Sequence, residues 1–304
     1  MFHVKHFLKK YISFGVFIIG KKKTLCYNRN IVKGAAISGV SPCGKELFMA
    51  RIIAVTNQKG GVGKTTTAIN LSACLAEVGQ HVLLVDFDPQ GNATSGLGLE
   101  KEDVDHTVYD LLTEECAFED CCISDLQKNL DILPSDMNLA GAEIEFQEVE
   151  DKEKLLHSYL EPVRDQYDFI IIDCPPSLNI LTINALTAAD TVIVPIQCEY
   201  YALEGLGQVL RTIDLVKRKL NPDLELEGVV FTMYDARTNL SLEVVENVKS
   251  NLNRTIYKTI IPRNVRLAEA PSHGMSINQY DTRSTGAESY RMLAAEVMSR
   301  GEDL

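Results

Sequence analysis

Short apolar runs alternate along this chain with longer segments whose apolar residues recur at helical spacing. The short runs predict strands, and they lie at 52–56, 81–87, 130–133, 169–173, 191–196, 226–233 and 258–261. The longer segments predict helices, clearest at 65–78, 139–146, 201–220, 242–252 and 287–299. Strand and helix therefore follow one another from residue 49 to the carboxyl end.

Several predicted strands are apolar at every position, so both of their faces need a cover. The run Phe169-Ile170-Ile171-Ile172 is typical of a strand buried between two helical layers. Alternation of strands and helices also favours right-handed crossovers between parallel strands. We therefore predict that residues 49–304 form a single α/β domain, a doubly wound and mostly parallel sheet with helices on both faces.

The charge of the chain is uneven. The 304 residues carry a net charge of −12, and 45% are hydrophobic, which excludes a disordered or collagen-like protein. Residues 1–48 contain nine basic residues and one acidic residue, for a charge of +8. Residues 49–304 keep 21 basic and 41 acidic residues, for a charge of −20. Any contact with nucleic acid in this second part has to come from locally clustered cations.

The basic segment 1–48 has one apolar run, residues 11–20, between lysines. This run is too short to cross a bilayer, which needs about 20 residues. A signal peptide is the alternative, but three lysines follow the run directly and no small-residue cleavage site comes after it. We expect a basic, disordered extension and a true start of the protein at Met49, just before the first strand.

Eight cysteines are scattered through the chain without a C-x-x-C pair. Cys121 and Cys122 are adjacent, which suits neither a zinc site nor an easy disulfide. Cys174 and Cys198 lack the surrounding pattern of an iron–sulfur site. We therefore expect reduced, mostly buried thiols.

A glycine-rich segment joins the first predicted strand to the first helix. Its glycines let backbone N–H groups curl around phosphate oxygens, and the helix amino terminus favours negative charge. Lys64 is expected to reach the β- and γ-phosphates, and the Thr65 hydroxyl to bind Mg²⁺. The candidate nucleotide-binding residues are Lys59, Gly60, Gly61, Val62, Gly63, Lys64, Thr65 and Thr66.

Carboxylates follow two of the predicted strands. Asp86 and Asp88 end the second strand, and Asp173 ends the strand at 169–173. Sites in parallel sheets gather at the carboxyl ends of strands, where a carboxylate can orient an attacking water. Four apolar residues before Asp173 are the Walker B pattern, which places this aspartate near Mg²⁺. Asp86 and Asp88 are also able simply to cap the following turn, and for Asp86 both readings stay open.

One departure from the ordinary phosphate loop is informative. Gln58 stands where that pattern has glycine, and Lys59 adds a second lysine. Lys-Gly-Gly-x-Gly-Lys-Thr is the deviant Walker A sequence, and the chain resembles the ParA/MinD family of P-loop ATPases, in particular the chromosomal ParA (Soj-type) partition proteins. The resemblance runs from about Met49 to the carboxyl end and includes residues 232–238 and 261–272.

This resemblance implies an ATPase that uses ATP and Mg²⁺ and forms an ATP-dependent homodimer. Lys59 would cross the dimer interface to the nucleotide of the partner subunit. Asp88, the second aspartate of the Asp-x-Asp-Pro-Gln-Gly-Asn segment, would be the one needed for hydrolysis. A ParB-type centromere-binding protein would stimulate that hydrolysis during chromosome or plasmid partition. The expected location is the cytoplasm, in association with the nucleoid.

The resemblance also implies binding of double-stranded DNA without sequence preference. Arg237 and Arg266 match arginines that the Soj-type family uses for this purpose. Such binding would be to phosphates and would depend strongly on salt. The alternative is a MinD-like positioning ATPase on a membrane. Residues 298–304 are acidic and lack a basic amphipathic helix, so no membrane association is expected.

The family also bears on the first residues. The centromere site of this system, read in frame as ATG TTT CAC GTG AAA CAT, translates to Met-Phe-His-Val-Lys-His, which is residues 1–6. We therefore interpret segment 1–48 as translated intergenic DNA that carries a ParB site.

Overall fold

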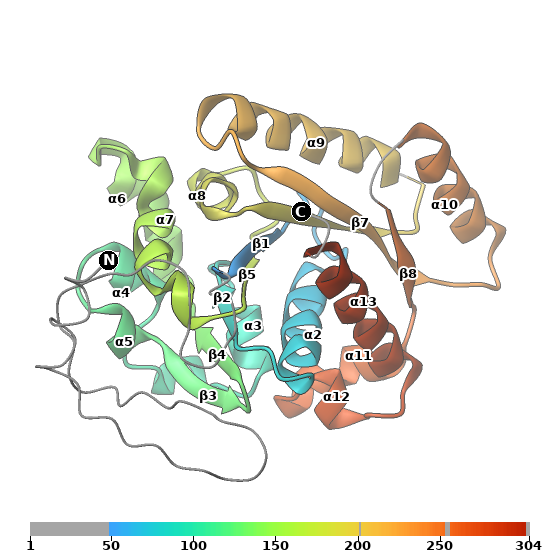
Figure 1. Cartoon of the computed structure of the whole chain (residues 1–304), viewed down its shortest axis with the longest axis horizontal. Helices are drawn as coiled ribbons and strands as arrows, with labels where there is room; N and C mark the ends of the chain where they lie inside the picture. Colours follow the sequence, from blue (N-terminus) through green and yellow to red (C-terminus); the bar gives the residue numbers. More distant parts are fainter. Residues whose placement is uncertain (1–48, 201, 253–255, 302–304) are drawn as a thin grey trace, which may run out of the picture. The chain divides into compact units, whose positions relative to one another are not determined.

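The computed structural model describes residues 49–200, 202–252 and 256–301, and the expected basic extension at 1–48 lies outside these described residues. In the described part, eight strands form one sheet (Figure 1). The strands are β1 (Arg51–Val55), β2 (Val82–Asp86), β3 (Ile123–Gln127), β4 (Leu130–Leu133), β5 (Phe169–Asp173), β6 (Thr191–Gln197), β7 (Glu225–Tyr234) and β8 (Ile256–Pro262).

The order of the strands across the sheet is β3-β4-β2-β5-β1-β6-β7-β8. All neighbouring pairs are parallel except β3 and β4, which are antiparallel. Strand β1 lies in the middle, and the chain leaves it to build first one half of the sheet and then the other. The predicted doubly wound, mostly parallel sheet is confirmed, and its carboxyl edge beside β1 is where such folds bind ligands.

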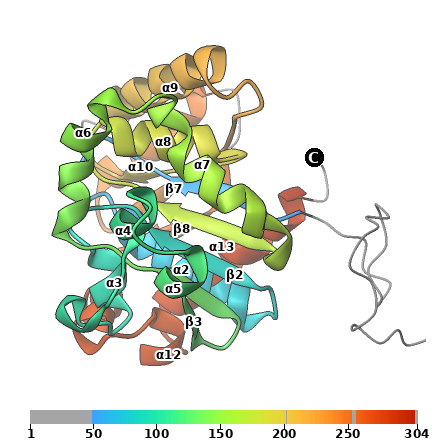
Figure 2. The same ribbon diagram turned by 90° about the vertical axis from the view of Figure 1, so that its left-hand side faces the viewer.

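Helices cover both faces of this sheet (Figures 1 and 2). The longer ones are α2 (Lys64–Glu77), α8 (Ile180–Ala188), α9 (Ala202–Lys219), α10 (Asn239–Asn251) and α13 (Thr285–Gly301). Shorter helices are α3 (Asn92–Gly96), α4 (Val108–Leu112), α5 (Phe118–Cys121), α6 (Ala142–Glu145), α7 (Leu155–Leu160), α11 (Val265–Glu269) and α12 (Ile277–Tyr280). None of the described helices is long and apolar enough to cross a membrane.

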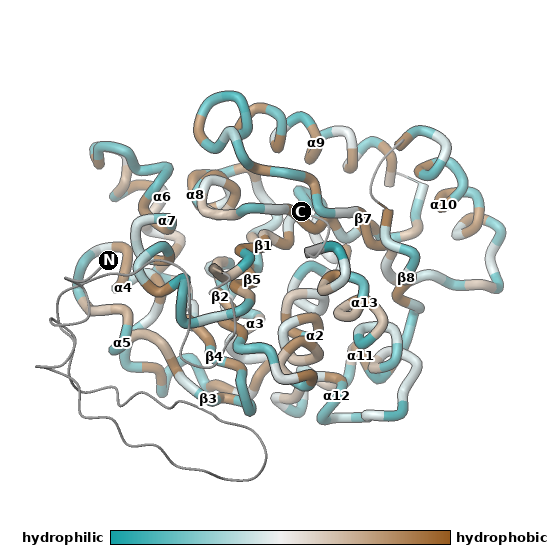
Figure 3. Tube along the Cα trace, viewed as in Figure 1, coloured by the Kyte–Doolittle hydropathy of each residue, from teal (hydrophilic) through white to brown (hydrophobic). Residues whose placement is uncertain are grey.

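Alternate residues of the central strands enter two separate cores. Ile170 and Ile172 of β5 pack in a cluster with α8 and α9, whereas Ile171 packs in a cluster with α2 and α13. Figure 3 shows the resulting hydrophobic colour along β1 and β5. The uniformly apolar sequence of β5 is thus explained by two helical layers, as expected for a strand that is buried on both faces.

The structure differs from the sequence prediction in its short helices, which the sequence analysis does not predict, and at three further places. Strand β3 was not predicted, because Ile-Ser-Asp-Leu-Gln is half exposed at the sheet edge and has no apolar run. Helix α8 was missed because it is buried on nearly all sides and has no amphipathic period. The helix predicted at 139–146 is broken into a 3₁₀ turn at Met137–Gly141, the single turn of α6, and a second 3₁₀ turn at Phe146–Glu148.

The expectation of reduced cysteines is wrong at one pair. A disulfide joins Cys116 and Cys121, whose Cα atoms are 6.7 Å apart. The turn of α5 brings the two residues together although they are five positions apart, a spacing that has no recognised motif. Among the described residues, Cys74, Cys122, Cys174 and Cys198 are free thiols, and three of these are buried.

Candidate active site

The predicted phosphate loop lies between β1 and α2, at the middle of the sheet. Gly61 and Gly63 have φ angles of 72° and 86°, a region that glycine adopts without strain. Gly63 is also the N-cap of α2, and no side chain there accepts a hydrogen bond. The first N–H groups of this helix therefore remain available to an anion.

Lys64 lies inside this loop and is almost fully buried. Its Nζ donates a hydrogen bond to the carbonyl oxygen of Lys59, 3.2 Å away. Burial lowers the pKa of Lys64, and the nearby carboxylates of Asp173 and Asp88, together with Cys174, act in the opposite direction. The ammonium group is thus close to Asp88 and Asp173, which the sequence analysis predicts for the same site.

Those carboxylates come from neighbouring strands. Asp86 of β2 and Asp173 of β5 pair in register at the carboxyl ends of their strands. Asp86 accepts hydrogen bonds from the N–H and the hydroxyl of Thr94, at 2.8 and 2.7 Å. Burial raises the pKa of Asp86 to about 6, and these hydrogen bonds oppose the shift. The structure therefore supports the capping role for Asp86.

Asp173 is in a different situation. It is completely buried, and neither carboxylate oxygen has a hydrogen-bond partner of ordinary geometry. Burial and then the charge of Asp86 raise its pKa, while the nearby Thr65 hydroxyl and Lys64 lower it. An unpartnered buried carboxylate beside a hydroxyl is a fitting pair of oxygen ligands for Mg²⁺.

Protein side chains alone do not complete such a metal site. Among the described residues, no three His, Cys, Asp or Glu side chains are grouped so that they could hold a metal ion. Mg²⁺ usually keeps few protein ligands and takes the others from phosphate and water. The arrangement of Thr65 and Asp173 therefore fits a metal that enters together with a phosphorylated ligand.

Asp88 lies on the turn that follows β2. Its side chain is mostly buried, and its Oδ1 accepts a hydrogen bond from the N–H of Gln90, 3.0 Å away. The backbone carbonyl of Asp88 accepts a second hydrogen bond from the Ser135 hydroxyl, also at 3.0 Å. Asp88 is close enough to Lys64 to influence its pKa, so the predicted water-orienting carboxylate lies beside the phosphate loop.

Lys59, the second lysine of the loop, points elsewhere. Its Nζ forms an ion pair with Glu199, at 2.6 Å, and about a third of its side chain is exposed. Glu199 lies in the turn between β6 and α9, and nothing in the sequence patterns singled it out. Lys59 is therefore not aimed into its own phosphate loop but toward an exposed part of the surface.

Thr232 belongs to a segment of the family resemblance, but the sequence patterns give it no role of its own. From the end of β7, its buried hydroxyl donates a 2.8 Å hydrogen bond to the carbonyl of Val62 in the phosphate loop. Only the three-dimensional structure brings these two residues together, since they are 170 positions apart in the sequence. The hydrogen bond connects the phosphate loop to the adjoining cavity, which Thr232 also lines.

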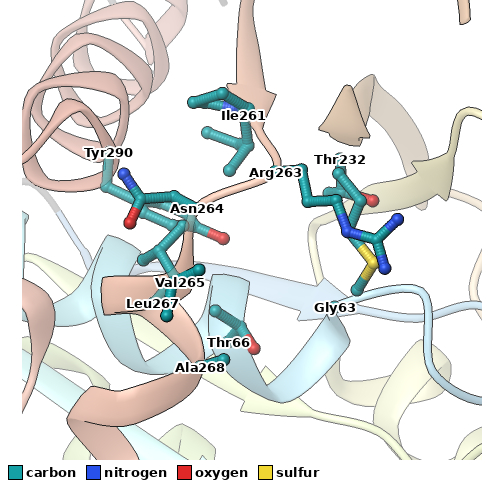
Figure 4. A pocket seen from close by; sticks show the side chains of 12 residues that line it. Gly63, Thr66, Thr232, Ile261, Arg263, Asn264, Val265, Leu267, Ala268 and Tyr290 are labelled. Carbon is teal, nitrogen blue, oxygen red and sulfur yellow. The ribbon is translucent and has the colours of Figure 1, made fainter. Parts of the chain in front are cut away.

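The cavity beside Gly63 has a volume of about 360 Å³. Figure 4 shows Thr66 of α2 on one side of it and Thr232 and Arg263 on another. Apolar walls with a few polar groups suit a flat, partly apolar ring. Met233 and Pro262 line it from the carboxyl ends of β7 and β8, and the segment that follows β8 adds Arg263, Asn264 and Val265.

The two arginines predicted to bind DNA follow neighbouring strands. Tyr234 of β7 pairs with Pro262 of β8, and Arg237 and Arg266 come a few residues after these two positions. The Arg237 side chain is 86% exposed and forms two hydrogen bonds to Asp235, at 2.8 and 2.6 Å. Both arginines thus follow strands at the carboxyl edge of the sheet.

Arg266 lies on α11 and is half exposed. Its guanidinium is 2.9 Å from a carboxylate oxygen of Glu269 and 3.5 Å from one of Asp281. Each of the two predicted DNA contacts therefore already has an acidic neighbour, which a phosphate would have to displace.

Comparison of the sequence with known proteins shows what this chain is similar to. A family model described as an AAA domain matches residues 50–226. The chain is 59% identical over 253 residues to the sporulation initiation inhibitor protein Soj of Bacillus subtilis, covering 83% of this chain and 100% of Soj. It is 50% identical over 252 residues to the chromosome partitioning protein ParA of Myxococcus xanthus, covering 83% of this chain and 89% of that protein.

The fold is also found among solved structures. A protein of Mycobacterium smegmatis described as cobyrinic acid a,c-diamide synthase, with a bound ATP analogue and magnesium, matches with a TM-score of 0.74 and 38% identity. The match covers 83% of this chain and 96% of that one. The fold of this chain is thus shared with a protein whose structure contains an ATP analogue and magnesium.

Proposed function

Because this chain belongs to the Soj/ParA group of the ParA/MinD family of P-loop ATPases, we propose that it is a partition ATPase that hydrolyses ATP to move chromosomal or plasmid DNA. The observation that carries this proposal is the arrangement of Lys64, Asp88 and Asp173 around one helix amino terminus. Lysine and aspartate side chains are usually exposed to solvent, but those of Lys64 and Asp88 are both buried. The charges of Asp173 and Asp88 lie close enough to Lys64 to affect its pKa, and phosphoryl transfer relies on such positioned charges.

ATP would occupy the phosphate loop and the adjoining cavity. The N–H groups of residues 60–66 and Lys64 would hold its phosphates, and the cavity near Met233 and Asn264 would take its base. Thr65, and Asp173 through water, would hold Mg²⁺, which neutralises phosphate charge as it develops. Asp88 would orient the attacking water.

Lys59 would act on the nucleotide of a second copy of the chain. Its ion pair with Glu199 keeps the ammonium away from its own phosphate loop, and ordinary exposed ion pairs are weak enough to exchange. Delivery of this lysine to a partner's phosphates would join two subunits around two nucleotides. The added positive charge would stabilise phosphoryl transfer, as an arginine finger does in other P-loop enzymes.

The ATP-bound dimer would then bind double-stranded DNA through Arg237 and Arg266. Two subunits double the number of phosphate contacts, so dimerisation and DNA affinity would rise together. A ParB-type centromere-binding protein would accelerate hydrolysis and so release the DNA. This cycle would keep the protein in the cytoplasm and on the nucleoid, without membrane binding.

The variant Asp88→Ala tests the catalytic assignment. We expect it to lower ATP turnover by about 100-fold, since water positioning is lost, while ATP binding and ATP-dependent dimerisation remain. Turnover is measured by phosphate release and dimerisation by light scattering. Asp223→Ala is the control, because this exposed aspartate lies just before β7, at the amino end of the strand and so opposite the carboxyl edge that carries the site. Unchanged turnover in Asp88→Ala would show that another group orients the water.

A further inference from the structure

The turn that carries Asp88 is hydrogen-bonded to a residue that follows a different strand. Ser135 follows β4, is 1% exposed, and lies 47 positions from Asp88 in the sequence. Its hydroxyl donates a 3.0 Å hydrogen bond to the backbone carbonyl of Asp88. Ser135 thus bonds to the main chain of the proposed catalytic residue and not to its carboxylate.

Ser135 also contacts the helix that follows this turn. Its N–H donates to the hydroxyl of Thr94 at 3.0 Å, and that hydroxyl in turn donates to Asp86 at 2.7 Å. Thr94 and Asp86 are both completely buried. One chain of hydrogen bonds therefore connects Asp86, Thr94, Ser135 and Asp88, and it closes the turn between β2 and α3 onto the end of β4.

The other end of this turn, at Gly91, also lies against Ser135. Gly91 has a φ of +56°, and a Cβ at this position would lie 2.5 Å from the carbonyl oxygen of Ser135 and 2.8 Å from Lys101 Cε. The ammonium of Lys101 donates to the carbonyl of Gln90. Only glycine fits here, because any side chain would push the turn away from Ser135.

We propose that Ser135 is a positioning residue for ATP hydrolysis, which fixes the Asp88 turn relative to the phosphate loop through its hydroxyl and through Thr94. This inference rests on the proposed function of Asp88. A shift of a catalytic group by about 1 Å can lower a rate by about 100-fold, so a residue that never touches the substrate can still control turnover. Ser135 is absent from the predicted site because no local motif marks it.

The contacts of Ser135 indicate which kinetic constant it controls. Among the cavity and phosphate-loop residues described above, none is bonded to Ser135, so its loss should leave nucleotide binding unchanged. The Asp88 carbonyl also accepts a second hydrogen bond, from the N–H of Gly91 at 2.8 Å. Removal of the Ser135 hydroxyl therefore leaves no main-chain group of the turn without a partner, and the fold should tolerate it.

The test compares Ser135→Ala with the full-length wild-type chain and with Ser276→Ala. Ser276 is also completely buried and hydrogen-bonded through its hydroxyl, but to Gln127 and Asn278. With MgATP, DNA and the ParB-type partner present, we expect Ser135→Ala to lower kcat about tenfold while KM stays within twofold of wild type. Ser276→Ala should keep the wild-type kcat.

A second variant approaches the same turn from the other side. Gly91→Ala should displace the turn from Ser135 and lower kcat at least as much as Ser135→Ala, again with little change in KM. This variant decides the matter if Ser135→Ala proves unstable in thermal unfolding. A wild-type kcat in both variants, or a raised KM with an unchanged kcat, would overturn the role of Ser135. Absence of turnover in the wild-type chain would instead overturn the proposed function.

Discussion

Two lysines of one loop have opposite surroundings. Lys64 is 6% exposed, and its ammonium lies among buried carboxylates. Lys59, five positions earlier, is about a third exposed and is paired with Glu199 across the surface. A buried cation at a helix amino terminus is suited to a ligand in its own subunit, and an exposed one is suited to a ligand outside it.

This difference predicts separate defects for the two alanine variants. Lys64→Ala should weaken ATP binding at least tenfold, because a charge-assisted contact to phosphate is lost. Lys59→Ala should bind ATP with near wild-type affinity but fail to dimerise. Fluorescent-nucleotide titration and analytical ultracentrifugation measure the two properties in each variant. Equal loss of ATP binding in both would contradict the assignment of Lys59 to a partner subunit.

At the scale of secondary-structure elements, Glu227 of β7 holds several of them together. Its carboxylate forms an ion pair with Arg51 of β1 at 3.2 Å and accepts hydrogen bonds from Thr191 of β6 and Tyr257 of β8. Arg51 in turn donates to the carbonyl of Val297 in α13. One buried carboxylate thus joins its own strand β7 to three others, β1, β6 and β8, and through Arg51 also to helix α13.

Removal of the negative charge of Glu227 should therefore destabilise the whole sheet. Glu227→Gln is expected to lower the free energy of unfolding by about 2–3 kcal/mol, because Arg51 remains buried without its counter-charge. Glu225→Gln, two positions away on the same strand, removes only an exposed pair with Lys217 and should cost less than about 1 kcal/mol. Urea unfolding measures both values. Equal effects of the two variants would show that the Arg51 pair contributes little.

The elements that the sequence predicted correctly share a physical cause. Strand β5 is a continuous apolar run because it is buried on both faces, and α9 has buried residues at helical spacing because one of its faces packs on the core. Strand β3 lies half exposed at the sheet edge and has no apolar run, and α8 is enclosed on nearly all sides and has no amphipathic period. The interrupted segment 137–148 shows that helical spacing alone does not ensure a continuous helix.

The candidate site, like the fold, was predictable from the sequence only in part. Asp86, Asp88 and Asp173 each end or follow a strand, so the parallel sheet alone brings them to one edge, and the register of Asp86 with Asp173 agrees with this. Ser135, Glu199 and Thr232 act through hydrogen bonds and ion pairs to residues more than 40 positions away. Such contacts leave no spacing pattern in the sequence. Their roles became visible only in the folded chain.

At the scale of the whole molecule, the charge of residues 49–304 is −20, which should repel DNA. Binding therefore depends on a few exposed cations, and the acidic neighbours of Arg237 and Arg266 weaken even these. Low ionic strength should strengthen binding, and the ATP-bound dimer should bind better than a single subunit.

The double variant Arg237→Glu/Arg266→Glu should consequently lose ATP-dependent DNA binding while it keeps ATP binding and dimerisation. Fluorescence anisotropy with an unrelated duplex at several salt concentrations measures the change. A matched double variant at basic positions of α9, Lys217→Glu/Arg218→Glu, should retain binding if the surface is local. Full DNA binding by the Arg237→Glu/Arg266→Glu variant would show that the DNA-binding surface lies elsewhere on the molecule.

The rate of ATP hydrolysis with DNA and with the cognate ParB-type protein, each alone and both together, tests the central claim most directly. A partition ATPase should be weakly active alone and should be stimulated by the two partners together by more than the sum of their separate effects. The same assay with liposomes of anionic lipid provides the opposing arm. Stimulation by liposomes, with none by DNA and the ParB-type protein, would contradict the partition function and favour a membrane-associated positioning ATPase.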